Sequence, residues 1–142
     1  MLVSPYYNKP PQSGLYKHFS MIAEKTSLPV MLYNVPSRTS RNLEAETVRE
    51  LAEIDNIIAV KEASGDMKQV GVLSTIEKDD FYIYSGDDGL TMSILAQGGQ
   101  GIVSVASHVI GKEIKQMVHL FKEGKLEEAV KLNNIQKLIS RA

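Results

Sequence analysis

The stretch Ile57-Ile58-Ala59-Val60-Lys61-Glu62-Ala63-Ser64-Gly65-Asp66 decides the fold class. An apolar, largely β-branched run ends in a lysine and is followed at once by small and turn-forming residues. Such an uninterrupted apolar run is typical of a strand that is covered on both faces in a parallel sheet. Ser64-Gly65-Asp66 supplies a turn, and Asp66 is a candidate N-cap for the next helix. The stretch therefore predicts a buried strand that carries an amine at its carboxyl end.

A lysine in this position has two interpretations. Desolvation favours the neutral form of an amine that in water titrates near ~10.4, and the neutral amine can attack a carbonyl and become a Schiff base. The alternative is a lysine whose amine reaches solvent past the strand end. The decapeptide alone favours the second interpretation.

The same alternation of strand and helix extends along the rest of the chain. Apolar runs predict strands, and apolar residues at helical spacing predict helices between them. The strands are expected at residues 2–7 (the tail of a strand), 29–33, 57–61, 81–84 and 102–105. Helices are expected at residues 15–25, 43–54 and 88–96, and another follows Asp66. A long helix is expected to end at Gly124 as an αL cap, and a final helix to run from Leu126 to the chain end. This order predicts a parallel α/β sheet with right-handed crossovers.

The number of strand-helix units predicts only part of a barrel. A complete (β/α)8 barrel needs roughly 250 residues, whereas this chain has 142. An open parallel sheet would leave two unprotected edges, which invite pairing with other chains. We therefore expect a partial TIM barrel over residues 1–124, followed over residues 125–142 by the start of a C-terminal helical region.

Composition narrows the classes of function. The formal net charge of -1 gives no electrostatic reason to expect nucleic acid or an anionic membrane surface as a partner. The absence of cysteine excludes disulfides, thiolate metal sites and a cysteine nucleophile. No apolar run approaches the roughly 20 residues that span a bilayer, and the first residues lack the pattern of a signal peptide. We expect a cytoplasmic protein.

Three side chains form a candidate site. Adjacent parallel strands lie about 4.8 Å apart, and reactive groups of barrels gather at the carboxyl ends of strands. Tyr33 and Lys61 occupy matching ends of neighbouring strands, so the phenol could exchange protons with the amine or its imine. Arg38 follows a proline-containing turn, where its guanidinium could bind a carboxylate with two hydrogen bonds.

The motifs around these residues resemble those of the dihydrodipicolinate synthase family. The resemblance is carried by Tyr33-Asn34-Val35-Pro36-Ser37-Arg38-Thr39, Val60-Lys61-Glu62-Ala63-Ser64-Gly65, Tyr84-Ser85-Gly86-Asp87-Asp88 and Pro5-Tyr6-Tyr7-Asn8-Lys9-Pro10. It implies a lysine-dependent lyase that condenses pyruvate with L-aspartate 4-semialdehyde to 4-hydroxy-tetrahydrodipicolinate, in lysine and diaminopimelate biosynthesis. It also implies no cofactor besides the covalent lysine imine, and no metal.

The resemblance assigns roles residue by residue. Lys61 would form the imine, Tyr33 would donate and accept protons, and Arg38 would hold the carboxylate of the semialdehyde. Val103 and Gly86 would offer main-chain contacts near bound pyruvate. Tyr7 would complete a proton relay by reaching into a neighbouring subunit, which implies a homo-oligomer, a dimer of dimers in the full-length protein.

The chain departs from the family pattern in one respect. The relay also needs a threonine from a Gly-Thr-Thr-Gly-type loop, expected before Met1, so the chain alone is expected to be catalytically incompetent. Two other functions stay open. One is another aldolase of the same superfamily, such as N-acetylneuraminate lyase or a 2-keto-3-deoxy sugar acid aldolase, against which Arg38 argues. The other is a non-catalytic barrel fragment that acts only in assembly.

Further candidates have simpler interpretations. Asp87 and Asp88 could be a metal pair, but carboxylates at a helix start more often cap that helix. The glycines of Gly98-Gly99-Gln100-Gly101 precede a strand, whereas phosphate-binding glycines follow one, so a helix-to-strand turn is expected. His108 follows the last strand and is a weak candidate for lining the site. Ser104 has no evident triad partners.

Overall fold

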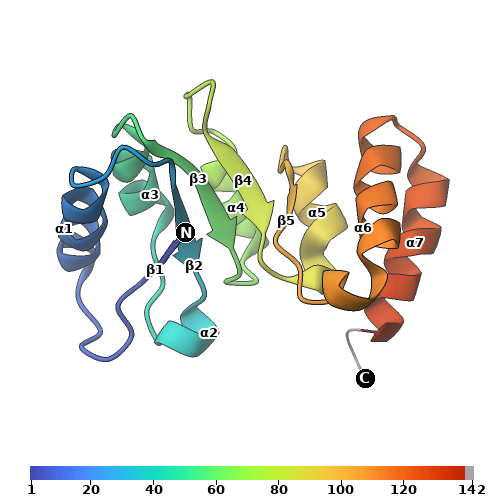
Figure 1. Cartoon of the computed structure of the whole chain (residues 1–142), viewed down its shortest axis with the longest axis horizontal. Coiled ribbons are helices and arrows are strands. Elements are labelled where there is room, and N and C mark those ends of the chain that lie inside the picture. The colour runs from blue at the N-terminus through green and yellow to red at the C-terminus, as the bar shows by residue number, and fades with distance from the viewer. Residues whose placement is uncertain (140–142) are drawn as a thin grey trace.

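Strands are followed by one or two helices throughout the computed structural model, which describes residues 1–139 and their side chains up to Gln136 (Figure 1). The elements are β1 (Leu2–Val3), α1 (Gln12–Ala23), β2 (Val30–Asn34), α2 (Pro36–Thr39), α3 (Ala45–Ala52), β3 (Ile57–Glu62), α4 (Met67–Leu73), β4 (Tyr82–Ser85), the 3-10 turn η1 (Asp88–Leu90), α5 (Thr91–Ala96), β5 (Gly101–Ile102), α6 (Ser107–Lys122) and α7 (Leu126–Ile139).

The strands within residues 1–139 form one five-stranded sheet in the order β1-β2-β3-β4-β5. Every strand pairs in parallel with its neighbour in the sequence. The predicted parallel α/β sheet is therefore confirmed. Its two outer strands, β1 and β5, have two residues each.

One face of the sheet is covered by helices, with α3, α4 and α5 behind the strands in the view of Figure 1. Leu32, Val60 and Ile83 point from the three central strands into this side. They pack there with buried side chains of the helices, among them Phe19 and Leu51. Burial of these apolar side chains is the main stabilising term for the fold.

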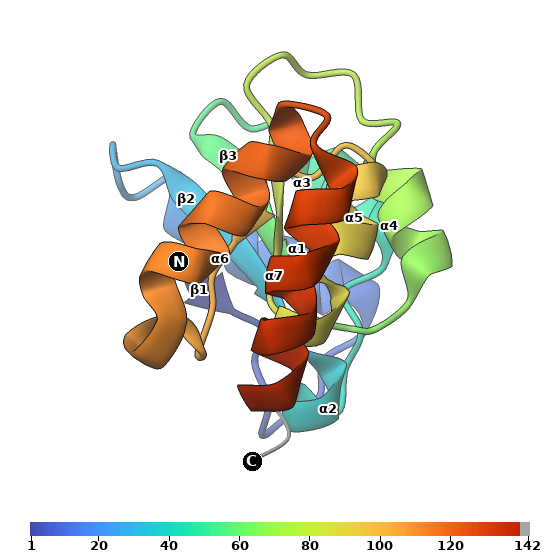
Figure 2. The same cartoon turned by 90° about the vertical axis from the view of Figure 1, so that its right-hand side faces the viewer.

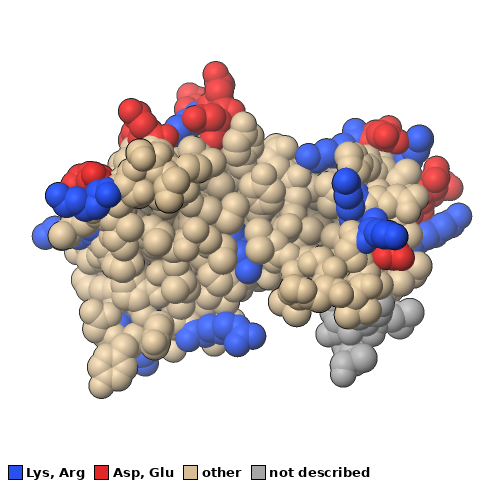
Figure 3. All heavy atoms as spheres, in the orientation of Figure 1, with Lys and Arg blue, Asp and Glu red and all other residues tan. Residues whose placement is uncertain are grey.

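The opposite face of the sheet is largely uncovered. Val3 and Tyr82 project from it with 42% and 38% of their surface exposed. In the same orientation, Figure 3 shows few charged side chains across this face and more of them along its upper rim and over α6 and α7. The uncovered face is thus lined by strands and carries few charged side chains.

The last two helices pack against each other, side by side in Figures 1 and 2. Met117 and Leu120 of α6 form a cluster with Ala129 of α7 that is separate from the main core. The turn between them contains Gly124 at φ 78°, as expected for an αL cap. The division into regions at residues 124 and 125 stays a prediction, and the predicted helical end at residues 140–142 lies outside the described residues.

Local signals explain most element boundaries. The side chain of Asp66 accepts hydrogen bonds from the backbone N–H groups of Lys68 and Gln69 at 2.8 and 3.2 Å, which confirms the predicted N-cap of α4. A short helix, α2, was not predicted, although Pro36 at its first position is already set for helical φ. The helix expected at 88–96 begins as the 3-10 turn η1 and continues as α5.

The last strand is shorter than the predicted 102–105, since β5 ends at Ile102. The N–H of Val103 still donates to the carbonyl of Ser85 at 2.9 Å. The hydroxyl of Ser104 then bonds the carboxyl group of Asp88, and the chain leaves the sheet at this point.

The amino ends of the strands are held by two polar side chains. Asn56 Nδ2 donates to the carbonyls of Ala23, Thr26 and Leu28 at 2.9, 2.9 and 3.3 Å. Lys78 Nζ donates to four carbonyls that follow α3 or end it, between 2.9 and 3.3 Å, those of Ala52, Ile54, Asp55 and Ile57. A cation at the end of a helix is favoured by the helix dipole.

Within residues 1–139, no helix combines the length and the apolar character that a membrane crossing requires. The cytoplasmic location expected from the sequence stays a prediction.

Candidate active site at the carboxyl ends of the strands

A lysine amine and a tyrosine ring meet at the centre of the sheet. Tyr33, Lys61 and Tyr84 occupy matching positions on β2, β3 and β4. Because side chains alternate between the faces of a strand, all three project from the uncovered face. Lys61 Nζ lies over the ring of Tyr33, 4.1 Å from the ring centroid, and the lysine is only 8% exposed. The amine and the tyrosine ring are therefore neighbours within one chain, and proton exchange between the phenol and the amine stays a prediction.

Gly86 closes one side of the lysine side chain. A Cβ atom at this position would lie 2.9 Å from Lys61 Cε and 2.7 Å from the Cβ of Ala63. Both separations are shorter than a carbon–carbon contact allows. Gly86 is not among the glycines with positive φ, so close approach, and not backbone conformation, requires glycine here.

The two residues predicted to offer main-chain contacts to pyruvate already use their backbone N–H groups in hydrogen bonds. The N–H of Gly86 donates to the carbonyl of Glu62 at 2.7 Å, and the N–H of Val103 donates to the carbonyl of Ser85 at 2.9 Å. Both N–H groups serve the continuation of the sheet.

Arg38 and Tyr7 lie on connections that leave the strand ends. Arg38 is exposed in the last turn of α2, which follows β2 directly and ends at Ser40 with φ 55°. Tyr7 follows β1 and is 93% exposed. Arg38 thus stands at the same end of the sheet as Tyr33, and Tyr7 is free to contact another molecule.

The sequence analysis missed a polar cluster on the covered face, directly behind the candidate site. Glu62 is 1% exposed and Asn34 is fully buried, and the two are hydrogen bonded. The signal available in the sequence was a second charged residue in an apolar strand, next to Lys61. Gln69 of α4 completes the cluster with a hydrogen bond to Glu62 at 3.0 Å.

The two aspartates after β4 accept backbone hydrogen bonds at different places. Asp87 Oδ1 accepts the N–H of Gly89 at 2.7 Å, which confirms its predicted capping role in η1. Asp88 instead accepts the N–H groups of Val105 and Ala106, each at 3.2 Å, at the start of α6. The prediction that Asp88 caps its own helix is therefore wrong, because β5 returns the chain to it. Within the described part of the chain, no group of three or more histidine, aspartate or glutamate side chains could hold a metal ion.

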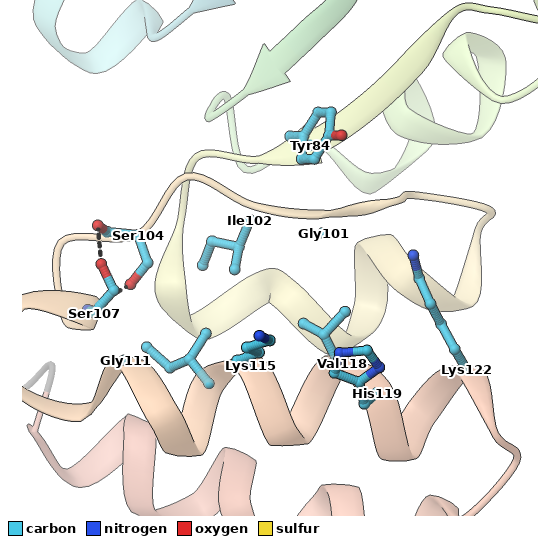
Figure 4. Close-up of a pocket in the computed structure, with 11 residues that line it drawn as sticks. Tyr84, Gly101, Ile102, Ser104, Ser107, Gly111, Lys115, Val118, His119 and Lys122 are labelled. Atoms are coloured by element: carbon cyan, nitrogen blue, oxygen red, sulfur yellow. Dashed lines mark hydrogen bonds between the residues drawn. The ribbon is translucent and has the colours of Figure 1, made fainter.

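A cavity of about 370 Å³ lies beside the candidate site, between the last strands and α6 (Figure 4). Tyr84, Gly101 and Ile102 line one side, and Lys115 and Lys122 lie on the α6 side, among its other residues. Lys61 and Tyr33 do not line it. His108, a weak candidate from the sequence, is exposed on α6 and does not line it either.

The fold and the site define a parallel α/β chain of the barrel type, with a lysine amine beside a tyrosine at the carboxyl ends of its strands. The chain belongs to the Dihydrodipicolinate synthetase family, whose model matches residues 1–141. This membership confirms the resemblance inferred from the motifs.

Individual relatives agree with the family assignment. The chain is 55% identical over 139 residues to the 4-hydroxy-tetrahydrodipicolinate synthase of Bacillus velezensis, covering 98% of this chain and 47% of the relative. It is 54% identical over 134 residues to that of Desulforudis audaxviator, covering 94% and 46%. The chain thus spans about half the length of the curated relatives it matches.

Solved structures show the same fold. A dihydrodipicolinate synthase from Bacillus anthracis superposes with a TM-score of 0.92 at 52% identity, over 96% of this chain and 47% of that one. The enzyme from Cyanidioschyzon merolae, solved with lysine bound, gives 0.90 at 51% identity over 92% and 45%. The predicted fold, part of a TIM barrel, is confirmed.

Proposed function

We propose that this chain carries the Schiff-base machinery of a 4-hydroxy-tetrahydrodipicolinate synthase, which condenses pyruvate with L-aspartate 4-semialdehyde on the route to diaminopimelate and lysine. One observation carries the proposal. Lys61 is nearly buried as a residue, and its amine lies 4.1 Å from the centre of the Tyr33 ring, at the end of the sheet where barrel enzymes place their chemistry. The identity of 55% to a synthase of that name supports it.

Lys61 is the nucleophile in this proposal. Its neutral amine attacks the carbonyl carbon of pyruvate, and loss of water leaves an imine. Removal of a proton from the methyl group gives an enamine, whose carbon attacks the aldehyde of the semialdehyde, and cyclisation follows. Tyr33 donates and accepts the protons, because it pairs with Lys61 in the β2–β3 register and its ring lies beside the amine.

The remaining residues bind and complete the site. Arg38 holds the carboxylate of the semialdehyde, since a guanidinium binds a carboxylate with two hydrogen bonds. Gly86 and Val103 offer main-chain contacts near bound pyruvate. Tyr7, which is 93% exposed, enters the site of a neighbouring subunit, so the working unit is a dimer, paired again into a tetramer.

Borohydride trapping tests the role of Lys61. The chain is incubated with pyruvate and sodium borohydride, which reduces an imine to a stable secondary amine. We expect peptide mass spectrometry to place the adduct on Lys61, and Lys61→Arg to abolish it. Lys68→Arg, an exposed lysine on α4, is the matched control and should leave the adduct unchanged. An adduct spread equally over the surface lysines would contradict the proposal.

A chimera tests the substrate assignment. The chain replaces the matching segment of the Bacillus velezensis relative, which shares 55% identity with it. We expect the chimera to consume pyruvate and aspartate semialdehyde, and the isolated chain to show no turnover. A folded chimera that traps pyruvate on Lys61 but does not use the semialdehyde would refute this substrate and retain the Schiff base.

A further inference from the structure

A buried carboxyl group lies directly behind the candidate site, on the opposite side of the sheet. Glu62 follows Lys61 in β3, so its side chain points to the covered face, where it is 1% exposed. No ion pair among the described residues includes it. Burying a polar group without partners costs free energy, and an apolar side chain of similar size would avoid that cost. The position therefore calls for an explanation.

Both oxygens of Glu62 act as acceptors. One accepts the backbone N–H of Ser64 at 2.6 Å and the amide of Asn34 at 3.2 Å. The other accepts the amides of Asn34 at 3.1 Å and Gln69 at 3.0 Å. A glutamine at position 62 would point its own N–H groups at some of these donors, and two donors cannot form a hydrogen bond with each other. The surroundings thus specify a side chain that only accepts hydrogen bonds.

A second layer of hydrogen bonds connects this group to the loop after α2. Asn34 donates to Asn42 Oδ1 at 2.8 Å and accepts the N–H of Leu43 at 2.9 Å. Asn42 donates to Gln69 Oε1 at 2.8 Å, and Gln69 donates to the carbonyl of Leu43 at 3.2 Å. Networks in which every member has partners favour one arrangement over its alternatives.

Three members of the network are close in sequence to a residue of the candidate site. Asn34 follows Tyr33, Glu62 follows Lys61, and Asn42 lies in the loop that begins after Arg38. The backbone joins the same segments, since Ala63 N–H donates to the Asn34 carbonyl at 2.9 Å and Gly86 N–H to the Glu62 carbonyl at 2.7 Å. One cluster therefore connects the ends of β2, β3 and β4 with the loop after α2.

We infer that Glu62 is a positioning residue, whose hydrogen bonds to Asn34, Gln69 and Ser64 hold the strand ends so that the Lys61 amine stays over the Tyr33 ring. This inference rests on the proposed function. The network touches no substrate and acts through the geometry of the residues on the other face. Displacement of reacting groups by about 1 Å can lower a rate about 100-fold.

The test compares Glu62→Gln with Asn56→Ala in the full chain. Asn56 also anchors three carbonyls, but at the opposite end of the sheet. The rate of pyruvate trapping on Lys61 is measured per folded molecule against pyruvate concentration. We expect Glu62→Gln to lower the maximal rate about 10- to 100-fold, and Asn56→Ala to leave it unchanged. Asn42→Ala, a milder change at the edge of the network, should lower it less and remains informative if Glu62→Gln fails to fold.

The outcomes separate this inference from the proposed function. If the wild-type chain traps pyruvate and Glu62→Gln or Asn42→Ala traps it equally fast, the positioning role is overturned. If the wild-type chain forms no adduct on Lys61, the proposed function fails, and hydrogen exchange decides the inference. The amide hydrogens of Ala63 and Gly86 should then exchange faster in Glu62→Gln than in Asn56→Ala. Equal exchange rates in the two variants would overturn the positioning role.

Discussion

The two faces of the sheet differ although they are built from the same strands. Leu32 and Val60 lie on the covered face and are fully buried, whereas their successors Tyr33 and Lys61 lie on the other face. Residues one position apart therefore have different surroundings. The covered face supplies stability through packing, and the uncovered face presents groups that can react.

The polar residues show the same contrast. Lys61 meets a ring and a glycine, and no hydrogen bond of its amine is among the contacts of the described residues. Glu62 meets donors to both of its oxygens. A side chain with all hydrogen bonds made holds a structure in place, while a side chain with bonding capacity to spare can bind a ligand. The candidate reactive group, Lys61, and the hydrogen-bonded cluster around Glu62 therefore lie on opposite faces of β3.

The largest effect is expected from shortening side chains on the covered face. Leu32→Ala removes a fully buried side chain from the core and should lower the free energy of unfolding by about 2–5 kcal/mol. Met31→Ala, a similar deletion on the half-exposed opposite face, should cost about 1 kcal/mol. Urea unfolding followed by circular dichroism measures both. Equal decreases in the free energy of unfolding would show that the two faces contribute equally to stability.

An intermediate effect is expected from filling the space beside the amine. In Gly86→Ala, the new methyl group overlaps Lys61 Cε and Ala63 Cβ and should displace the lysine. We expect trapping of pyruvate to fall about tenfold, and the free energy of unfolding to fall by about 1–3 kcal/mol. Gly111→Ala is the control, because its Cβ would meet nothing closer than 3.9 Å. Normal trapping in Gly86→Ala would show that the lysine does not need this space.

The smallest effect concerns charge on the covered side. Burial lowers the pKa of His18, a residue of α1 whose ring contacts Phe19 of the core. At pH values between the folded and the unfolded pKa of His18, the unfolded chain binds more protons than the folded chain. The free energy of unfolding therefore rises with pH in this range, and the contribution of neutral His18 is lost as the pH falls below about 6.5. His18→Gln should make the free energy of unfolding less dependent on pH in this range. Urea titrations on either side of it measure the slope, and an unchanged slope would contradict the assignment.

Much of the fold followed from local patterns. The apolar runs located all five strands of the described sheet, Asp66 was identified as an N-cap, and Gly124 as a helix end. Two of the errors occurred where a distant segment decides the outcome. Asp88 accepts the N–H groups of Val105 and Ala106 because the chain passes it after β5, and Ser104, which was expected in the strand, bonds Asp88 there. No periodicity in the sequence reports such contacts.

The candidate site was predicted in part for the same reason. Lys61, Tyr33 and Arg38 stand next to strand ends, and their types suggested their chemistry. Gly86 was predicted as a main-chain contact, while its steric role beside Lys61 became visible only in the structure. Glu62 was not predicted, because a carboxyl group in an apolar strand gives no indication of its partners.

The sequence by itself determined the order of strands and helices and the placement of an amine at a strand's carboxyl end, since both depend on residues that are neighbours along the chain. Only the tertiary structure decided that this amine lies over the ring of Tyr33 and that Glu62 is enclosed by Asn34, a residue 28 positions away. The physical reason is that two neighbouring parallel strands are connected by a helix, so residues that pair across them are far apart in sequence. The contacts that shape the site therefore join distant segments.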